Sequence, residues 1–465
     1  MNPNFQTAHA CIEAFSSGEV SAREIAISFL GQIEAFNPKL NAFTSITRDR
    51  ALAEAAAIDT LRARGESLPR LAAVPYAVKN LYDVENIKTL AGARIMERNP
   101  PAKSDGTLVE RMHDAGALLM GTQNMDAFAY GFTTENTHYG ATHNPRDTER
   151  TPGGSSGGTG AAIAAGLVPI GLGSDTNGSI RVPASLCGIY GLKPTYGRLP
   201  RTGTFPFVAS LDHLGPLAAT VEDLALVYDV LQGHDRADPT CAPRDCAPVS
   251  DTLTQGISGL RVGLLGGYFY DNAGPEARWA AKTAAFALGA KDEITLAGVN
   301  QARSAAFVIT ALEGGALHLR GLREHASEFE PLSRDRLLAG ALVPSAWYQQ
   351  AQRYRRHYLE QTLAHFDKYD LLIAPATPVR APFLGQATFQ INDKEFPTRP
   401  NLGILTQPIS FIGLPVSVAP LWPDDHLPIG VQLIAAPWRE DICLRAAWAL
   451  QAFGISSSRV KCKRG

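Results

Sequence analysis

The chain has 465 residues, of which 45% are hydrophobic and 19% are charged, and its formal net charge is −2. This composition is ordinary for a globular enzyme, and the near-neutral charge disfavours a nucleic-acid or anionic-membrane partner, which would require a basic surface. The opening residues lack a basic segment followed by an apolar one, and no apolar run is long enough to span a bilayer. We therefore expect a cytoplasmic protein without a membrane anchor.

The cysteines are scattered along the chain and form no C-x-x-C pair or zinc-ligand spacing. They are Cys11, Cys187, Cys241, Cys246, Cys443 and Cys462. Reduced thiols in a reducing compartment explain such a pattern, and we expect no metal site.

Residues 1–68 are predicted to be helical. Ser21 and Glu24 stand at the spacing of a capping box, in which each side chain bonds the backbone N–H of the other residue. Apolar residues recur at helical spacing behind this box, and Asn37-Pro38 is expected to end the helix. A second, alanine-rich helix is expected over about 48–64.

From Leu71 onward, short apolar runs with strand composition alternate with helical segments, including a helix led by Pro275. The expected strands are Ala73–Val78, Ala117–Met120, Val168–Leu172, Leu260–Leu265 and Leu371–Ala374. This alternation predicts an α/β fold with a mixed or parallel central sheet. We expect one domain over residues 1–465, with a catalytic core at 71–200 and the remaining sheet and helices at 201–465.

Two glycine-serine loops, at 153–158 and 173–179, flank a helix–strand unit, and each leads into a helix. Glycine permits a close backbone approach, and the free N–H groups at such a turn bind anions or the oxyanion of a reaction intermediate. Neither loop matches the templates of nucleotide cradles. Two interpretations remain: tight turns with helix-capping serines, or a catalytic Ser179 on a strand-to-helix turn.

A catalytic serine requires a base. None of the eleven histidines lies in a recognisable motif, and the nearest ones, His138 and His143, occupy a polar loop. A lysine can serve instead if burial lowers its pKa enough to make it neutral. Lys79 follows the apolar strand AAVPYAV and would emerge from the core there, although a lysine that reaches solvent fits the same pattern.

The residues of both loops resemble a known family. GGSSGG at 153–158, GSDTNGSIRVPA at 173–184, KPTYGR at 193–198 and PYAVKN at 75–80 are similar to the core motifs of the amidase signature family. Further similarity at 413–415 and 427–433 extends it over nearly the whole chain. The resemblance implies the amidase signature fold, which is α/β with a large mixed central sheet surrounded by helices, and it implies no metal and no cofactor.

The family's catalytic triad maps onto this chain. The resemblance makes Ser179 the nucleophile, Ser155 a relay serine that follows a cis peptide bond, and Lys79 the base. Ser179 stands 24 positions after Ser155, the separation found in family members. Asp175 and Arg181 are expected to brace the loop.

The resemblance also implies an oxyanion hole made of the backbone N–H groups of Thr176, Asn177, Gly178 and Ser179. Most relatives have glycine in place of Asn177. Because asparagine tolerates unusual backbone angles better than most residues, we expect the turn to accept it.

Within the family, the chain is broadly similar to the A subunits of tRNA-dependent amidotransferases, which hydrolyse glutamine and pass ammonia on. Arg336 corresponds to the arginine that binds the glutamine carboxylate. The aspartate that binds the α-amino group falls at Gly403, and Tyr130 replaces a pocket methionine. These positions predict a small amide or urea derivative that carries a carboxylate but no ammonium and is cleaved with release of ammonia.

Alternatives remain open. For the function, the alternatives are a glutamine or other small-amide amidase, an ammonia-supplying A-type subunit, and a binding subunit that has lost catalysis. For Arg336, the alternative is an arginine on the exposed face of a helix. Retention of Lys79, Ser155 and Ser179 together disfavours a non-catalytic subunit. The resemblance also implies a hetero-oligomer with a small helical partner similar to the amidotransferase C subunit.

Overall fold

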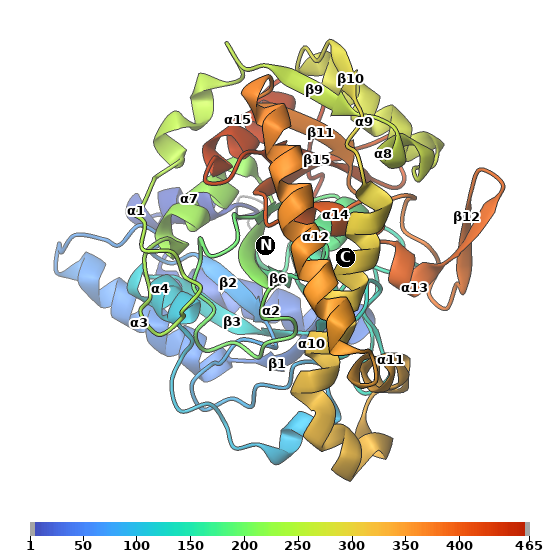
Figure 1. Cartoon of the computed structure of the whole chain (residues 1–465). Coiled ribbons are helices and arrows are strands. Elements are labelled where there is room, and N and C mark those ends of the chain that lie inside the picture. Colours follow the sequence, from blue (N-terminus) through green and yellow to red (C-terminus); the bar gives the residue numbers. More distant parts are fainter. Residues whose placement is uncertain (1–4, 461–465) are drawn as a thin grey trace.

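The computed structural model describes residues 5–460, and a mixed sheet of eleven strands forms its centre (Figure 1). Its strands are β1 (Phe43–Ile46), β2 (Pro75–Lys79), β3 (Leu118–Gln123), β6 (Ile170–Asp175), β7 (Tyr190–Lys193), β8 (His213–Ala218), β9 (Val262–Leu265), β10 (Asp292–Ile294), β11 (Leu371–Pro375), β14 (Val416–Leu421) and β15 (Ile429–Ala435). Two separate hairpins pair β4 (Glu135–Asn136) with β5 (Gly140–Ala141) and β12 (Thr388–Ile391) with β13 (Lys394–Pro397).

Helices surround the sheet. The α-helices are α1 (Ala8–Ser16), α2 (Ala22–Leu40), α3 (Arg48–Ala63), α4 (Thr107–Asp114), α5 (Gly157–Ala164), α6 (Arg181–Cys187), α7 (Val221–Leu231), α8 (Tyr268–Asp271), α9 (Pro275–Ala287), α10 (Val299–His325), α11 (Pro331–Ala341), α12 (Ser345–Leu363), α13 (Thr398–Asn401), α14 (Gln407–Ser410) and α15 (Glu440–Ala452). Short 3₁₀ turns lie at Arg94–Arg98, Ala127–Ala129, Ser250–Gln255, Ala326–Glu328 and Ala364–Asp367. No helix within residues 5–460 is long and apolar enough to cross a membrane.

The strand order is β1-β3-β2-β6-β8-β7-β14-β15-β11-β9-β10. Strands β3, β2 and β6 run parallel to one another, as do β11, β9 and β10. Between β6 and β11 in this order, every pair of neighbouring strands is antiparallel. The predicted α/β class with a large mixed sheet is therefore confirmed. Each predicted strand also overlaps an observed one, with ends that differ by a few residues.

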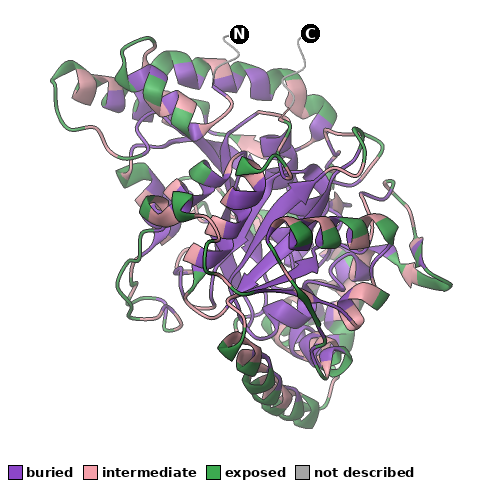
Figure 2. Ribbon diagram, turned by 90° about the horizontal axis from the view of Figure 1, so that it is seen from above, coloured by how far each residue is buried: buried purple, intermediate pink, exposed green. Residues whose placement is uncertain are grey.

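The sheet is covered on both faces. Every residue of β6, β14 and β15 is buried. Since successive side chains of a strand point to opposite faces, burial of all of them means that helices or loops pack against both sides. Figure 2 shows this arrangement, with the buried strands enclosed by helices whose outer faces are exposed.

The N-terminal helices follow the prediction at their starts. Ser21 Oγ accepts a hydrogen bond from the Glu24 backbone N–H, and the Glu24 carboxylate accepts one from the Ser21 backbone N–H at 2.8 Å. The capping box is therefore confirmed. The alanine-rich helix is α3, whose observed bounds fit the predicted ones closely.

The predicted end of α2 at Asn37-Pro38 is wrong, because the helix continues through these residues to Leu40. Pro38 lies in the last turn, where its missing N–H removes a single backbone hydrogen bond. The Asn37 side chain closes this end, since its Oδ1 accepts from the backbone N–H groups of Ala42 and Phe43, each at 2.8 Å.

The parallel pairing of β2 with β6 positions the site. Val78 lies opposite Leu172 in this pair, so Lys79 at the end of β2 and the turn that follows β6 emerge at the same edge of the sheet. Ligands of open α/β sheets bind at such carboxyl ends of strands. As predicted, each glycine-serine loop leads into a helix: α5 begins at Gly157, near the end of the first loop, and α6 begins just after the second.

Replacing Leu433 by alanine should lower the free energy of unfolding by about 2–5 kcal/mol, because its side chain is fully buried in β15 at the centre of the sheet. Urea unfolding followed by circular dichroism measures the change. Leu342→Ala is the matched control, since Leu342 is 84% exposed, and it should leave the midpoint nearly unchanged. Equal midpoints for the two variants would contradict the observed packing.

Candidate active site

Lys79 ends strand β2 inside the protein rather than in solvent. Its side chain is fully buried, and its Nζ lies 2.6 Å from Ser155 Oγ and 2.9 Å from Ser174 Oγ. The structure therefore joins two of the three predicted catalytic residues directly. Sequence reasoning missed Ser174, although it belongs to the second glycine-serine loop and precedes the turn by two residues.

Burial lowers the pKa of Lys79 to about 7, because the ammonium loses its hydration in the core. The carboxylates of Asp126, Asp175 and Asp212 act in the opposite direction but do not offset the burial. A lysine with such a pKa is substantially neutral near pH 7 and can accept a proton there.

The peptide bond between Gly154 and Ser155 is cis. Only glycine fits at position 154, because a Cβ atom there would lie 2.1 Å from Asp126 Oδ2 and 2.6 Å from the Thr133 nitrogen. The same Asp126 carboxylate accepts a hydrogen bond from the Thr134 N–H at 3.0 Å and pairs with Arg399 at 3.0 Å. Asp126 therefore lies beneath the loop that presents Ser155 to Lys79.

The turn after β6 carries the predicted oxyanion hole. The N–H groups of residues 176–179 have no acceptor within the part of the chain that the structure describes, so they are free to bind an oxyanion. The unusual backbone angle falls on Gly178, at φ 141°, where a Cβ atom would lie 2.1 Å from Thr406 Oγ1. Asn177 is not among the positive-φ residues, so the turn accepts its Cβ without the special tolerance that we expected to matter.

Ser179 follows this turn and lines a pocket. The Ser156 N–H donates to the Ser179 carbonyl at 3.3 Å, which joins the two glycine-serine loops. Within residues 5–460, no hydrogen bond links the side chains of Ser155 and Ser179. The structure thus places the three predicted catalytic residues in one site, with Ser179 on the pocket side and Lys79 on the core side.

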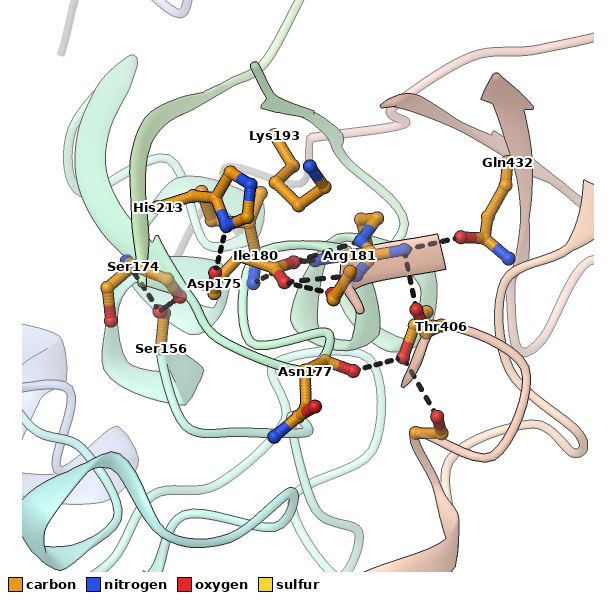
Figure 3. Close-up of polar contacts among 12 residues, drawn as sticks. Ser156, Ser174, Asp175, Asn177, Ile180, Arg181, Lys193, His213, Thr406 and Gln432 are labelled. Carbon is orange, nitrogen blue, oxygen red and sulfur yellow. Dashed lines mark hydrogen bonds and ion pairs between the residues drawn. The ribbon is translucent and has the colours of Figure 1, made fainter. Parts of the chain in front are cut away.

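Asp175 and Arg181 brace the turn from within the core, as expected (Figure 3). Both side chains are fully buried, and the guanidinium donates to both carboxylate oxygens at 3.0 Å. Burial opposes ionisation of Asp175, but the Arg181 guanidinium outweighs it and holds the pKa of the carboxyl well below its usual range. Arg181 also donates to Gln432 Oε1 at 2.6 Å and to the Thr406 carbonyl at 3.1 Å, so the brace reaches β15 and the loop before α14.

No histidine within residues 5–460 hydrogen-bonds to Lys79, Ser155 or Ser179. The buried His213 instead lies beside Asp175, with its Nδ1 3.1 Å from the Asp175 carbonyl (Figure 3). Burial lowers its pKa well below the usual value.

The pocket beside Ser179 is small and carries one charge. Among its described lining residues, Arg336 is the only charged side chain; the others are Ala129, Tyr130, Gly131, Phe132, Thr176, Asn177, Ser179, Phe207, Phe307, Thr310 and Gln407. Arg336, on α11, stacks on the Tyr130 ring with its Cζ 3.7 Å from the ring centroid. Burial lowers the pKa of the Arg336 guanidinium, which stays cationic at neutral pH because a free arginine has a pKa above 12.

Gly403 borders the pocket through Phe132. A Cβ atom on Gly403 would lie 2.3–2.7 Å from three atoms of the Phe132 ring, so the ring occupies the space that a side chain at 403 would need. An acidic side chain at this position would require Phe132 to move. The pocket therefore lacks, within its described lining, a carboxylate that would pair with a substrate ammonium.

Comparison with known proteins places the chain in a family. The amidase family model matches residues 24–444. The chain is 58% identical over 453 residues to AtzE of Pseudomonas sp. (strain ADP), a component of 1-carboxybiuret hydrolase, covering 97% of this chain and 99% of the relative. It is 39% identical to the A subunit of the glutamyl-tRNA(Gln) amidotransferase from Chloroflexus aggregans (strain MD-66 / DSM 9485), with 96% of each chain covered.

A solved structure is also similar. It is described as a vestigial protein complex that reveals the origins of an s-triazine catabolic enzyme, and it matches with a TM-score of 0.97 and 57% identity over 98% of this chain and 100% of that chain. This chain therefore belongs to the amidase family, and it is a hydrolase that acts on C–N bonds.

Activity should rise with pH through a single ionisation near pH 7. Protonated Lys79 cannot accept a proton, whereas the neutral amine that predominates above its pKa can. The pH dependence of kcat/KM measures this ionisation. Lys193 is the control, because burial lowers its pKa to about 7 as well although it lies behind the turn. Lys193→Met should leave the ionisation in place, and its disappearance in that variant would contradict the assignment to Lys79.

Proposed function

We propose that this chain hydrolyses a small urea derivative that carries a carboxylate, of the 1-carboxybiuret type, to urea-1,3-dicarboxylate and ammonia. The observation that carries the proposal is the single charge of the pocket: Arg336 faces a site with no carboxylate in its described lining. Such a site favours an anionic substrate and disfavours one with an ammonium group, such as glutamine. The high identity to a 1-carboxybiuret hydrolase component over nearly the full chain supports the same substrate.

The proposed mechanism is acyl transfer to Ser179. Neutral Lys79 accepts a proton from Ser155, which accepts one from Ser179, and Ser179 Oγ attacks the terminal carbonyl. The N–H groups of residues 176–179 hold the oxyanion, each contributing about 3 kcal/mol. The C–N bond then breaks, and the proton returns through Ser155 to the departing nitrogen, which leaves as ammonia. Water attacks the acyl-enzyme by the same route and releases the second carboxylate.

The space of the pocket limits the size of the substrate. The volume open to the centre of a water molecule is about 20 Å³, little more than one water requires. The contact between Arg336 and Tyr130 closes one side. Binding of a small, planar urea derivative requires the guanidinium to turn from the ring toward the substrate carboxylate, a pairing that arginine makes through two parallel hydrogen bonds.

We further propose that the chain works in a hetero-oligomer with a small helical partner similar to the amidotransferase C subunit. The solved structure of the similar chain is described as a protein complex, which supports association. Size-exclusion chromatography of the chain, alone and mixed with a small helical protein similar to the amidotransferase C subunit, tests this proposal, and the mixture should elute earlier than either protein alone.

Ammonia release from a set of substrates tests the proposed activity. With the purified protein, 1-carboxybiuret should be hydrolysed faster than biuret, allophanate, glutamine or simple amides. Ser179→Ala should lower kcat by several orders of magnitude, as removal of a serine nucleophile does in other hydrolases, while Ser304→Ala, on an exposed face of α10, should not. Robust glutamine hydrolysis, or turnover that survives Ser179→Ala, would refute the proposal.

Arg336→Ala should raise KM for 1-carboxybiuret by at least about tenfold, because a charge-assisted hydrogen bond to the carboxylate is lost. KM for the neutral biuret should change much less. Arg334→Ala is the matched control, since Arg334 lies on the same helix but pairs with Asp335 at 2.9 Å instead of lining the pocket. An equal rise in KM for both substrates would show that Arg336 does not bind the carboxylate.

A further inference from the structure

Asn177 lines the pocket and leaves one polar atom unpaired. Its Nδ2 donates to Thr310 Oγ1 on α10 at 3.0 Å, whereas its Oδ1 is buried and has no partner in the described chain. The residue is only 7% exposed, so bulk water does not readily satisfy this oxygen. A buried acceptor without a donor is unfavourable, and such groups in native proteins call for a reason.

Gln407, at the start of α14, leaves an unpaired donor in the same pocket. Its Oε1 accepts a hydrogen bond from Arg303 Nε at 3.0 Å. A guanidinium can only donate, so the amide oxygen must face Arg303 and the Nε2 group must face the other way. Nε2 has no acceptor in residues 5–460, and it is not fully buried. Gln407 itself is 3% exposed, which leaves the pocket as the space that Nε2 reaches.

Contacts around Gln407 fix this orientation. Arg303 also donates to Asn401 Oδ1 and stacks over the Phe307 ring, with its Cζ 5.1 Å from the centroid. The Asn401 side chain in turn donates to the Pro397 carbonyl at 2.8 Å. Arg303 is therefore held from several sides and acts as a positioning residue for the Gln407 amide.

Thr406 connects the two segments that carry the amide side chains. Its hydroxyl donates to the Asn177 carbonyl at 2.7 Å, which ties the residue before Gln407 to the oxyanion turn (Figure 3). No hydrogen bond links the Asn177 and Gln407 side chains to each other within the described chain. One free acceptor and one free donor thus line the pocket that Ser179 and Arg336 also line.

We propose that Asn177 Oδ1 and Gln407 Nε2 bind the urea unit next to the scissile carbonyl. Asn177 accepts a hydrogen bond from a substrate N–H group, and Gln407 donates to a substrate C=O group. This inference rests on the proposed function and deepens it. Urea chains alternate N–H and C=O groups along one edge, which matches an acceptor beside a donor, whereas an alkyl chain offers neither group. Asn177 then determines specificity in addition to forming part of the oxyanion turn.

The test compares two substrates that differ in the urea unit alone. Glutaramate has the same chain length between carboxylate and terminal amide as 1-carboxybiuret, but methylene groups replace the inner urea. The readout is the ratio of kcat/KM for 1-carboxybiuret to that for glutaramate. Sites built to hydrogen-bond a substrate group reject analogues that lack it, so this ratio should be large for the unmodified protein.

Gln407→Glu should lower the ratio about ten- to a hundredfold. Glutamate still accepts from Arg303 but has no donor, and its charge repels the carboxylates of both substrates alike, so that the repulsion cancels in the ratio. Asn177→Ala should lower the ratio by a similar factor. Arg303→Met should mimic Gln407→Glu, and Arg303→Lys should restore part of the ratio because an ammonium can still donate to Oε1. Gln350→Met, an exposed glutamine of α12, is the control.

The outcomes separate this inference from the proposed function. If the unmodified protein fails to hydrolyse 1-carboxybiuret, the proposed function is wrong before any variant is compared. If it does hydrolyse it but the Gln407 and Asn177 variants keep the ratio, or lose activity on both substrates equally, the amide pair is structural and the inference is overturned. Melting temperatures of the variants, measured alongside, show whether each protein is folded.

Discussion

The buried ion pair between Asp175 and Arg181 is the interaction on which the site depends. It joins the last residue of β6 to the first residue of α6 and so fixes the turn between them, which presents the free N–H groups and Ser179. The same guanidinium contacts Gln432 and Thr406, which lie far along the chain. Breaking such a pair leaves an uncompensated charge in the core, so the turn has one favourable geometry.

Burial also gives Lys79 its chemistry. An ammonium in the core loses its hydration, and three nearby carboxylates restore only part of that loss, so the pKa falls to about 7. Lys193 experiences a similar fall in pKa, yet its ammonium nitrogen donates to the adjacent Pro194 carbonyl at 3.0 Å. A lowered pKa is therefore insufficient for a catalytic base. The contact of Lys79 with Ser155, on the loop beside the turn that carries Ser179, distinguishes the two lysines.

The pocket combines three recognition elements in a small space. Arg336 supplies a positive charge, the turn supplies N–H groups for an oxyanion, and two amide side chains supply an acceptor and a donor. The Phe132 ring fills the place where a side chain on Gly403 would project. The proposed substrate, an anionic, planar molecule with alternating polar groups, satisfies all of these elements.

The sequence by itself determined the fold class, the family, five of the eleven strands of the central sheet and the candidates Lys79, Ser155 and Ser179, because these depend on local patterns and on long motifs. It did not determine where α2 ends, since the Asn37 side chain closes the helix beyond Pro38. It could not show that Lys79 is buried, because a strand-end lysine reaches either solvent or core.

Only the tertiary structure brought Thr310, Arg303 and Gln407 to the loop that carries Ser174 and Asn177. Ser174 and Asn177 belong to the motif around the turn after β6, whereas Arg303 and Thr310 lie on α10 and Gln407 begins α14, and no motif links these three segments. Their roles follow from which atoms are paired and which are left free. That depends on how the sheet and helices pack, a constraint that sequence spacing does not contain.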